Sequence, residues 1–349
     1  MTKPERVVAS LTGRTPDMVP FIVNTTMKGL QQRLLGREIT EPTVDGMNIT
    51  GWVGRPEDGG ETAPLLSTVP EAASLLNLDA IQIQMVPPIY AEKSVENGNV
   101  YVLNGLIDGA GALKNVRMPD PDDDKPLLAA EAMISRYKGA FALGARVRLC
   151  ASPVILSVGL ENIAYFYADE DDTLFKTVEM YAEWSRRLNA NLSEMDFDFF
   201  WAFDDIAYSS GMLVSPAMFK EIFKDGMKRA ASAITKPWIF HSDGDYRLIL
   251  DDILDLGASG IHPIEKASMD TRWLKENYGN KLCLVGNVDI ETLTNGTEAE
   301  TDEEVRRCID TLGKDGRYIL SDSNSVPDGV KPENALAMAG AVEKYRRIY

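Results

Sequence analysis

The chain has 349 residues, of which 44% are hydrophobic, and that length can bury a large core without help from disulfide bonds. Lys and Arg number 36 against 53 Asp and Glu, so the formal charge of -17 disfavours nucleic acid and anionic membrane surfaces as partners. Three widely spaced cysteines and an N-terminal segment without an apolar core exclude a secreted disulfide framework and favour a cytoplasmic protein.

Short apolar runs alternate with longer amphipathic stretches along almost the whole chain. Eight of these runs are predicted to be strands buried on both faces: residues 18–23, 79–85, 147–151, 196–203, 237–241, 260–264, 282–286 and 317–321. Helical periods separate them, and in one such segment Ser215 is suited to cap the N-terminus and Pro216 to occupy the first turn. This pattern predicts an α/β fold, a closed parallel TIM (β/α)8 barrel. A doubly wound open sheet would also alternate, but no Gly-rich fingerprint follows the first strand.

One segment interrupts the alternation. Residues 96–118 place Gly-rich turns around a run of period two, which predicts a β-hairpin insert between the second and third strands, near the barrel mouth. The acidic residues 119–126 that follow are expected to form a solvated loop leading into a helix. No long linker, repeat or low-complexity tract divides the chain, so residues 1–349 are predicted to form a single domain.

Polar residues are dense where the later strands end, and in such barrels the reactive groups lie at the C-terminal ends of the strands. His241 is the most distinctive, because HSDGD places a carboxylate two residues on and a Gly for a tight turn. Neighbouring residues on a strand point to opposite faces, so we expect one of Asp204 and Asp205 to act as a general acid or base and the other to cap the next helix or pair with an Arg. The remaining candidates at strand ends are Tyr208, Asp243, His262, Glu265, Asn287, Asp289 and Asn324.

Several motifs in order carry a family resemblance. They are DD(x)A, SPAMF, HSDG, GIHPIE, YGNKLCLVGNVD, NG(T), YILSDSNSV and PENALAM, within about Asp196 to Met338. This pattern resembles the uroporphyrinogen decarboxylase superfamily, whose fold is a TIM barrel. The resemblance therefore implies the same fold that the strand count predicts.

The superfamily holds two main chemistries. True uroporphyrinogen decarboxylases grip their substrate with an Arg-rich segment of the RQAGRY kind, whereas the corresponding stretch here, NTTMKGLQQRLLG, lacks it. The resemblance then implies a cobamide-dependent methyltransferase that moves a methyl group from a small methylated substrate, such as an aromatic methyl ether, to a corrinoid protein. No cobalamin-binding Asp-x-His-x-x-Gly signature is visible, so the cobalamin is expected on that partner. A decarboxylase-like lyase and a non-catalytic corrinoid- or tetrapyrrole-binding protein are the alternatives.

Many methyltransferases of the superfamily hold zinc through His-x-Cys and a distant Cys. Here His241 matches the His, Asp243 stands where the Cys would be, and the last-strand segment SDSNS has no Cys. A His and carboxylate set still suits zinc as a Lewis acid for an oxygen leaving group, and we nominate His241, Asp243 and Glu265 as its ligands. Without metal, Asp205 or His241 would act as a catalytic general acid. In either version the expected substrate-binding residues are Asp204, Tyr208, His262, Asn287, Asp289 and Asn324.

Overall fold

The computed structural model describes all of residues 1–349 and is built on one curled, eight-stranded sheet. Seven strands run parallel, in the order β13-β12-β11-β10-β7-β6-β3, and β2 is added antiparallel beside β3. The strands of this sheet are β2 (Leu65–Leu66), β3 (Ala80–Gln84), β6 (Ala142–Val147), β7 (Phe199–Phe203), β10 (Trp238–His241), β11 (Gly260–His262), β12 (Cys283–Val288) and β13 (Tyr318–Asp322).

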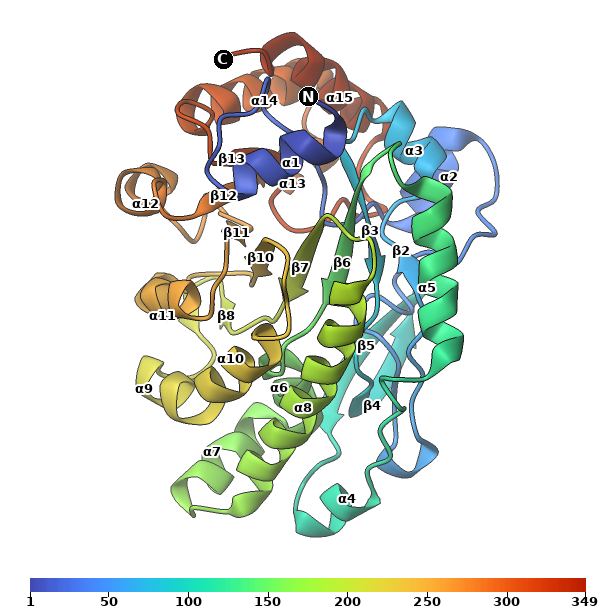
Figure 1. Ribbon diagram of the computed structural model, residues 1–349, viewed down its shortest axis with the longest axis vertical. Helices are drawn as coiled ribbons and strands as arrows, with labels where there is room; N and C mark the ends of the chain where they lie inside the picture. The colour runs from blue at the N-terminus through green and yellow to red at the C-terminus, as the bar shows by residue number, and fades with distance from the viewer.

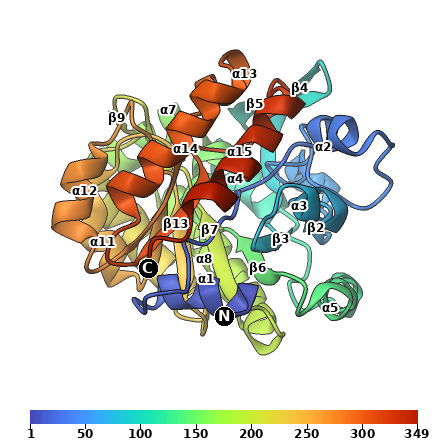
Figure 2. The same cartoon turned by 90° about the horizontal axis from the view of Figure 1, so that it is seen from above.

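Helices cover the outside of the curled sheet, as expected for parallel strands joined by crossover helices (Figures 1 and 2). The longest is α8, which Asp171 caps at its N-terminus by accepting a hydrogen bond from the Thr173 N–H. The α-helices are α1 (Lys3–Leu11), α2 (Lys28–Leu35), α3 (Pro70–Leu75), α4 (Ala110–Asn115), α5 (Asp124–Tyr137), α6 (Ala151–Val158), α7 (Leu160–Ala168), α8 (Asp172–Glu194), α9 (Pro216–Met218), α10 (Asp225–Ala231), α11 (Leu250–Asp255), α12 (Thr271–Tyr278), α13 (Ile290–Asn295), α14 (Glu298–Leu312) and α15 (Pro332–Tyr345). Short 3-10 turns form η1 (Pro56–Asp58) and η3 (Arg247–Ile249), and η2 (Phe219–Lys224) is a π-helical turn between α9 and α10.

The run at residues 18–23 does not form a regular strand, but it bridges the two ends of the parallel sheet. The Ile22 N–H donates to the Leu320 carbonyl of β13 at 3.1 Å, and the Phe21 carbonyl accepts from the Asp79 N–H, just before β3, at 2.7 Å. Pro20 lacks an N–H, which shortens the ladder on this segment. The curled sheet is thus consistent with the predicted TIM barrel.

Six of the predicted strands fall on strands of the sheet, whereas the third was placed wrongly. The strand is β6, Ala142–Val147, and residues 147–151 instead turn into α6. Gly144 interrupts the apolar run of β6, so this strand is hard to recognise in the sequence. The turn after it contains the apolar residues Leu149 and Cys150, which are buried at the start of α6 and therefore resemble a strand. This shift moves Arg146 and Arg148 to the end of a strand.

A hairpin insert follows the second predicted strand as expected, but it begins earlier than predicted, and the second part of the predicted range instead contains α4. Strands β4 (Ile89–Glu96) and β5 (Asn99–Gly105) pair antiparallel around Asn97 and Gly98, which both have positive φ. β4 begins five residues after β3 ends, so the hairpin lies at the carboxyl ends of the strands, away from the chain termini (Figure 1). Two further pairings are small: β1 (Val53–Gly54) adds to β4, and β8 (Ala207–Tyr208) pairs with β9 (Gly211–Met212).

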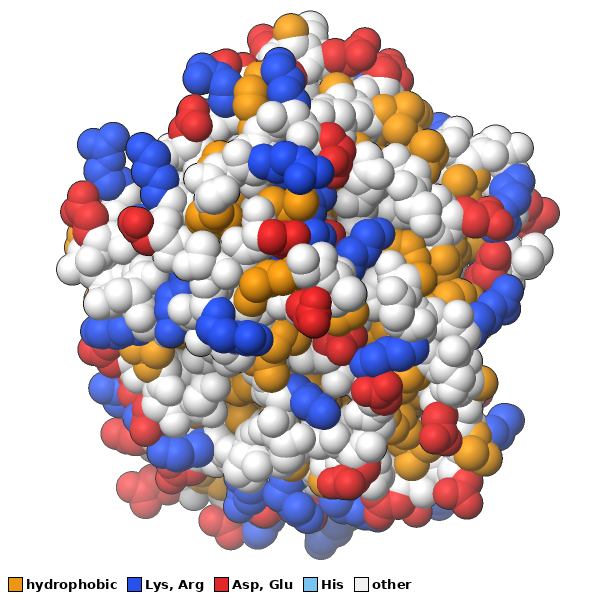
Figure 3. Space-filling view, turned by 45° about the horizontal axis from the view of Figure 1, so that its top comes forward, with side chains coloured by type: hydrophobic (Ala, Val, Ile, Leu, Met, Phe, Trp, Pro, Cys, Tyr) orange, Lys and Arg blue, Asp and Glu red, His pale blue; other side chains and the backbone are white.

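The inside of the curled sheet holds its own apolar cluster, separate from the larger core under the helices. Phe199, Trp201, Ile239 and Val285 project into it from the strands, and Leu11 of α1 joins them at the other end. The outer face seen in Figure 3 carries acidic and basic side chains interspersed. None of the helices is both long enough and apolar enough to cross a bilayer.

Candidate functional site

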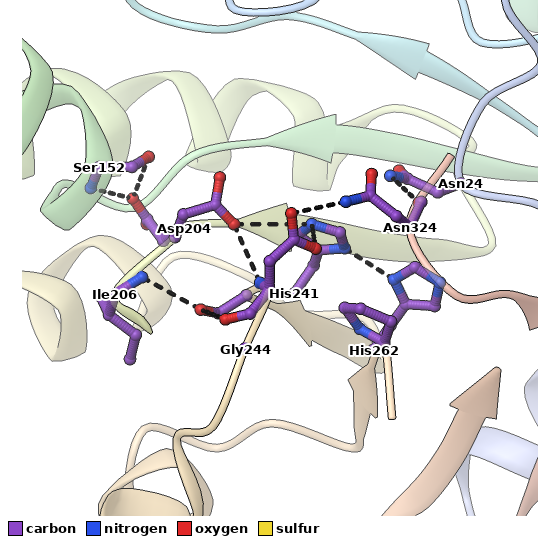
Figure 4. Close-up of polar contacts among 12 residues, drawn as sticks. Asn24, Ser152, Asp204, Ile206, His241, Gly244, His262 and Asn324 are labelled. Carbon is purple, nitrogen blue, oxygen red and sulfur yellow. Dashed lines mark hydrogen bonds and ion pairs between the residues drawn. The ribbon is translucent and has the colours of Figure 1, made fainter. Parts of the chain in front are cut away.

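The polar strand ends meet at one level of the sheet. Parallel pairing sets Phe203 of β7 beside His241 of β10, and His241 beside His262 of β11. Phe203 and Trp201 belong to the cluster inside the sheet, so side chains at the same register project to the same interior. The two histidines of the chain therefore face each other at the carboxyl-end mouth (Figure 4).

A chain of hydrogen bonds fixes the tautomers of both histidines. The Asp322 backbone carbonyl, which can only accept, lies 3.1 Å from His262 Nε2, so this nitrogen carries the proton. Burial lowers the pKa of both histidines well below the usual value, so both rings are neutral at neutral pH. His262 Nδ1 then accepts from the His241 Nδ1–H across 2.7 Å. The His241 Nε2 lone pair is left facing the mouth.

Two carboxylates face that lone pair. The Nε2 atom of His241 lies 3.7 Å from Asp205 Oδ1 and 3.6 Å from Asp243 Oδ1. These distances are too long for hydrogen bonds. Ligands of a tetrahedral zinc at about 2.0–2.1 Å lie about 3.4 Å apart, so both distances from His241 Nε2 are close to the spacing of atoms that share a cation. The three ligand atoms all lie within 4.8 Å of one another. Asp243 Oδ1 is also buried without a hydrogen-bond partner. The donor set and geometry therefore fit a metal ion.

Burial raises the pKa of both acids, and neighbouring carboxylates add to the rise at Asp243. Burial and the neighbouring Asp205 and Glu265 raise the pKa of Asp243 to about 8, against a hydrogen bond from Asn324. Asp205 is 42% exposed at its side chain, yet the surrounding groups displace bulk water from it, and this desolvation raises its pKa, opposed by Arg148. The site thus favours a positive charge or a proton between the acids.

The HSDGD turn places Asp243 through its backbone. Gly244 has φ +80, and a Cβ there would lie 2.2 Å from the Tyr208 carbonyl oxygen, so only glycine fits. The Gly244 N–H donates to Glu265 Oε2 at 3.1 Å, and Asn324 Nδ2 donates to Asp243 Oδ2 at 2.6 Å. Glu265 therefore supports the turn, and the structure places Asp205 rather than Glu265 with His241 and Asp243 in the candidate metal group.

Asp204 points away from the mouth, as alternation along the chain requires. It is fully buried, and its oxygens accept hydrogen bonds from the N–H groups of Leu149, Cys150 and Ser152 and from the Ser152 hydroxyl, at 2.6–3.2 Å. The side chain thereby anchors the start of α6 (Figure 4). One member of the acid pair was expected to support the next helix, but Asp204 supports the preceding α6 instead, and its oxygens are taken up there rather than turned toward a substrate.

Three other predicted substrate-binding residues lie apart from the histidines. Tyr208 is 52% exposed beside the turn, and Asp289 caps α13 by accepting from the Glu291 N–H. Asn287 is buried, with its Nδ2 donating to the Ile264 carbonyl and its Oδ1 without a partner. The residues that the structure brings together are Asp205, His241, Asp243, His262 and Asn324.

Two arginines that were not predicted as site residues also lie at this mouth. Arg146 of β6 donates to Asn24 Oδ1 at 3.1 Å and to Gln84 Oε1, and Arg148 donates to Ser152 Oγ. Their guanidinium groups lie 3.9 and 4.2 Å from the Phe203 ring centre. The alternating pattern in ARVRLC, with arginines two residues apart at the edge of an apolar run, is the signal that could have found them.

A curled, mostly parallel α/β sheet with its polar site at the carboxyl ends of the strands defines the general class of barrel-like α/β proteins. Within this class, residues 140–345 match the family model described as uroporphyrinogen decarboxylase (URO-D). The chain belongs to this family.

A methyltransferase from Methanosarcina mazei has a similar solved structure, with 19% sequence identity, 99% of each chain covered and a TM-score of 0.72. This likeness shows a shared fold along the whole chain. A B12-independent methionine synthase from Shewanella sp. W3-18-1 is more distant, with 11% identity, 72% of this chain and 75% of that chain covered, and a TM-score of 0.40. No curated protein matches by sequence.

Proposed function

We propose that this protein is a corrinoid-dependent methyltransferase acting at the mouth of a TIM barrel, in which residues 20–22 take the place of the missing strand. It would move a methyl group from a small methylated substrate, such as an aromatic methyl ether, to a corrinoid protein. One observation carries the proposal: His241 Nε2, Asp205 and Asp243 converge at the strand ends of a URO-D family member. The M. mazei methyltransferase, which shares the fold, supports the same activity.

Asp205, His241 and Asp243 would hold zinc, which supplies a Lewis acid for the ether oxygen. His262 fixes the His241 tautomer, and Asn324 orients Asp243. As the methyl carbon passes to the Co(I) of the partner's corrinoid, the electron pair of the broken C–O bond stays on oxygen, which leaves as the alkoxide or phenolate and takes up a proton. Carboxylates in place of thiolate ligands suit an oxygen leaving group.

A metal-free version uses the same residues. In it a proton occupies the space between the acids and His241, and Asp205 or His241 delivers it to the leaving oxygen as a general acid. The two versions differ in one measurable property, the metal content of the active protein.

Transfer to free cob(I)alamin tests the function directly. We expect the purified protein to convert cob(I)alamin to methylcobalamin, seen in the visible spectrum, when supplied with a methyl donor from a panel of methyl ethers, methylamines and methanol. His241→Ala should lose at least about 100-fold in rate, the low end of the usual contribution of a positioned acid–base group. Glu298→Gln, on the exposed first turn of α14, is a matched control and should retain the rate. A protein that only binds a corrinoid would give no methylcobalamin with any donor.

A further inference from the structure

Four arginines are almost fully buried in this chain, and they fall into two pairs with different surroundings. Arg6 and Arg346 both form ion pairs with the buried Asp79, at 2.7 and 2.6 Å. Arg146 and Arg148 are 2% and 4% exposed, and no carboxylate oxygen lies within 4.0 Å of either guanidinium group. The second pair is therefore buried without a direct ion pair, and the acids nearest to it, Asp204, Asp205 and Asp322, act on it only from a greater distance.

The hydrogen bonds of this second pair all go to neutral acceptors. Arg146 donates to the side-chain amides of Asn24 and Gln84, and Arg148 to the Ser152 hydroxyl and, at 3.5 Å, to the Thr50 carbonyl. Arg148 Nε is buried with no partner. Asp204 reaches Arg148 only through the Ser152 hydroxyl, which accepts from Arg148 and donates to Asp204 Oδ1. Two neighbouring buried cations without a direct ion pair are costly, so this arrangement favours an anion supplied from outside the chain.

The two arginines face the same interior as the proposed reaction site. Arg146 pairs with Trp201 in the β6–β7 ladder, which continues to set Arg148 beside Phe203 and Phe203 beside His241. Neighbouring strands lie about 4.8 Å apart, so Arg148 and His241 are separated by about 10 Å, with the Phe203 ring between them. Both guanidinium groups contact this ring: the Arg146 group lies 3.9 Å from the ring centre and the Arg148 group 4.2 Å from it.

A cavity of about 280 Å³ opens beside Gln84, and the two arginines lie behind this residue rather than in the cavity lining. Gln84, which holds Arg146, lines the cavity, and so do Lys93 and Glu61 from the hairpin and its neighbouring loop. The Gln84 amide also donates to the Asn48 carbonyl at 3.1 Å, so the segment that carries Asn48 and Thr50 covers the arginines. Burial and the neighbouring Arg148 lower the pKa of Arg146 to about 9, as expected for two cations held together.

We infer that Arg146 and Arg148 form a binding subsite for the carboxylate of a small anionic substrate. The planar guanidinium fork matches a carboxylate in geometry, and such charge-assisted bonds are stronger than neutral ones. This inference rests on the proposed function. The methyl donor is then a methylated carboxylate, and its methyl-bearing end reaches His241, Asp205 and Asp243 across the Phe203 ring. The subsite explains how a chain of net charge -17 binds an anion, because the two cations lie inside the mouth.

Binding of carboxylates and of their neutral amides tests this subsite without any corrinoid. Benzoate and 4-methoxybenzoate are titrated calorimetrically into the metal-loaded wild-type protein, against benzamide and 4-methoxybenzamide at equal ionic strength. We expect each carboxylate to bind roughly ten- to a hundredfold more tightly than its amide, and we expect Arg146→Gln and Arg148→Gln each to remove that preference. Arg148→Lys, which keeps the charge and loses the fork, should fall between. Arg55→Gln, an exposed arginine at the same end of the molecule, should behave as wild type.

Comparison of amide and carboxylate on the unaltered protein keeps the test valid even if a variant fails to fold. The subsite is overturned if wild type binds neither carboxylate, binds amide and carboxylate equally, or keeps the preference in both Gln variants. Methyl transfer is not part of the readout. An arginine-dependent carboxylate preference without methyl transfer to cob(I)alamin from any donor would contradict the proposed function and leave the subsite standing.

Discussion

His262 provides the sharpest test of the hydrogen-bond chain behind the candidate metal site. In His262→Phe, the His241 Nδ1–H loses its acceptor at 2.7 Å in a site where His241 is 4% exposed and His262 fully buried. Nothing then holds His241 in the tautomer whose Nε2 lone pair faces Asp205 and Asp243. Loss of such an outer-shell partner lowers metal affinity by about 10- to 100-fold, and the unsatisfied buried N–H costs about 1–3 kcal/mol of folding free energy.

His262→Asn is the matched control, because its side-chain oxygen can take the place of His262 Nδ1 and accept the same hydrogen bond. Zinc affinity is measured by competition with a chromogenic chelator, and unfolding free energy by urea denaturation. We expect both variants to lose stability and only the Phe variant to lose zinc affinity by at least about tenfold. Equal zinc affinity in the two variants would refute the tautomer argument.

Three further predictions concern the frame of the site. Asp204→Asn should lower the unfolding free energy by about 3 kcal/mol, because one amide nitrogen replaces an oxygen that accepts from the start of α6, and an unchanged urea midpoint would contradict the capping role. Gly244→Ala should cost about 1–3 kcal/mol and weaken zinc binding, because its Cβ would meet the Tyr208 carbonyl oxygen 2.2 Å away, and wild-type zinc affinity would count against it. Burial raises the pKa of Asp322 to about 7, above its unfolded value of about 3.9. Between these two pH values the folded state holds a proton that the unfolded state has lost. The contribution of Asp322 to stability therefore falls as the pH rises from about 4 to 7. Asp322→Asn should remove that fall, by up to about 4 kcal/mol relative to wild type, and parallel pH–stability curves for the two proteins would refute it.

Much of the fold follows from local patterns in the chain. Buried runs such as FFWAF and CLVGNV are apolar enough to be recognised as strands, and the Asn97–Gly98 turn marks the hairpin. The third strand was misplaced because Gly144 weakens ALGARV while the turn after it is apolar. That shift of five residues also concealed the arginines, since a residue's place at a strand end is visible only when the strand is placed correctly.

The site was predictable in part. The turn HSDGD indicated His241 and Asp243, and alternation indicated that Asp204 and Asp205 would take different roles. The choice between Asp205 and Glu265 depends on which backbone N–H each carboxylate meets, and this is set by the packing of β7 against β10 and by the Gly244 turn. The partner of His241 was likewise hidden, because His262 is 21 residues away along the chain and adjacent only through strand register.

The metal content of purified variants tests the proposed zinc site. Wild type, His241→Ala, Asp205→Asn and Glu265→Gln are purified with zinc present, dialysed and analysed by plasma mass spectrometry. We expect near-stoichiometric zinc in wild type and Glu265→Gln, and its loss in His241→Ala and Asp205→Asn. Zinc that persists in Asp205→Asn, or is absent from wild type, would contradict a metal centre built from Asp205, His241 and Asp243.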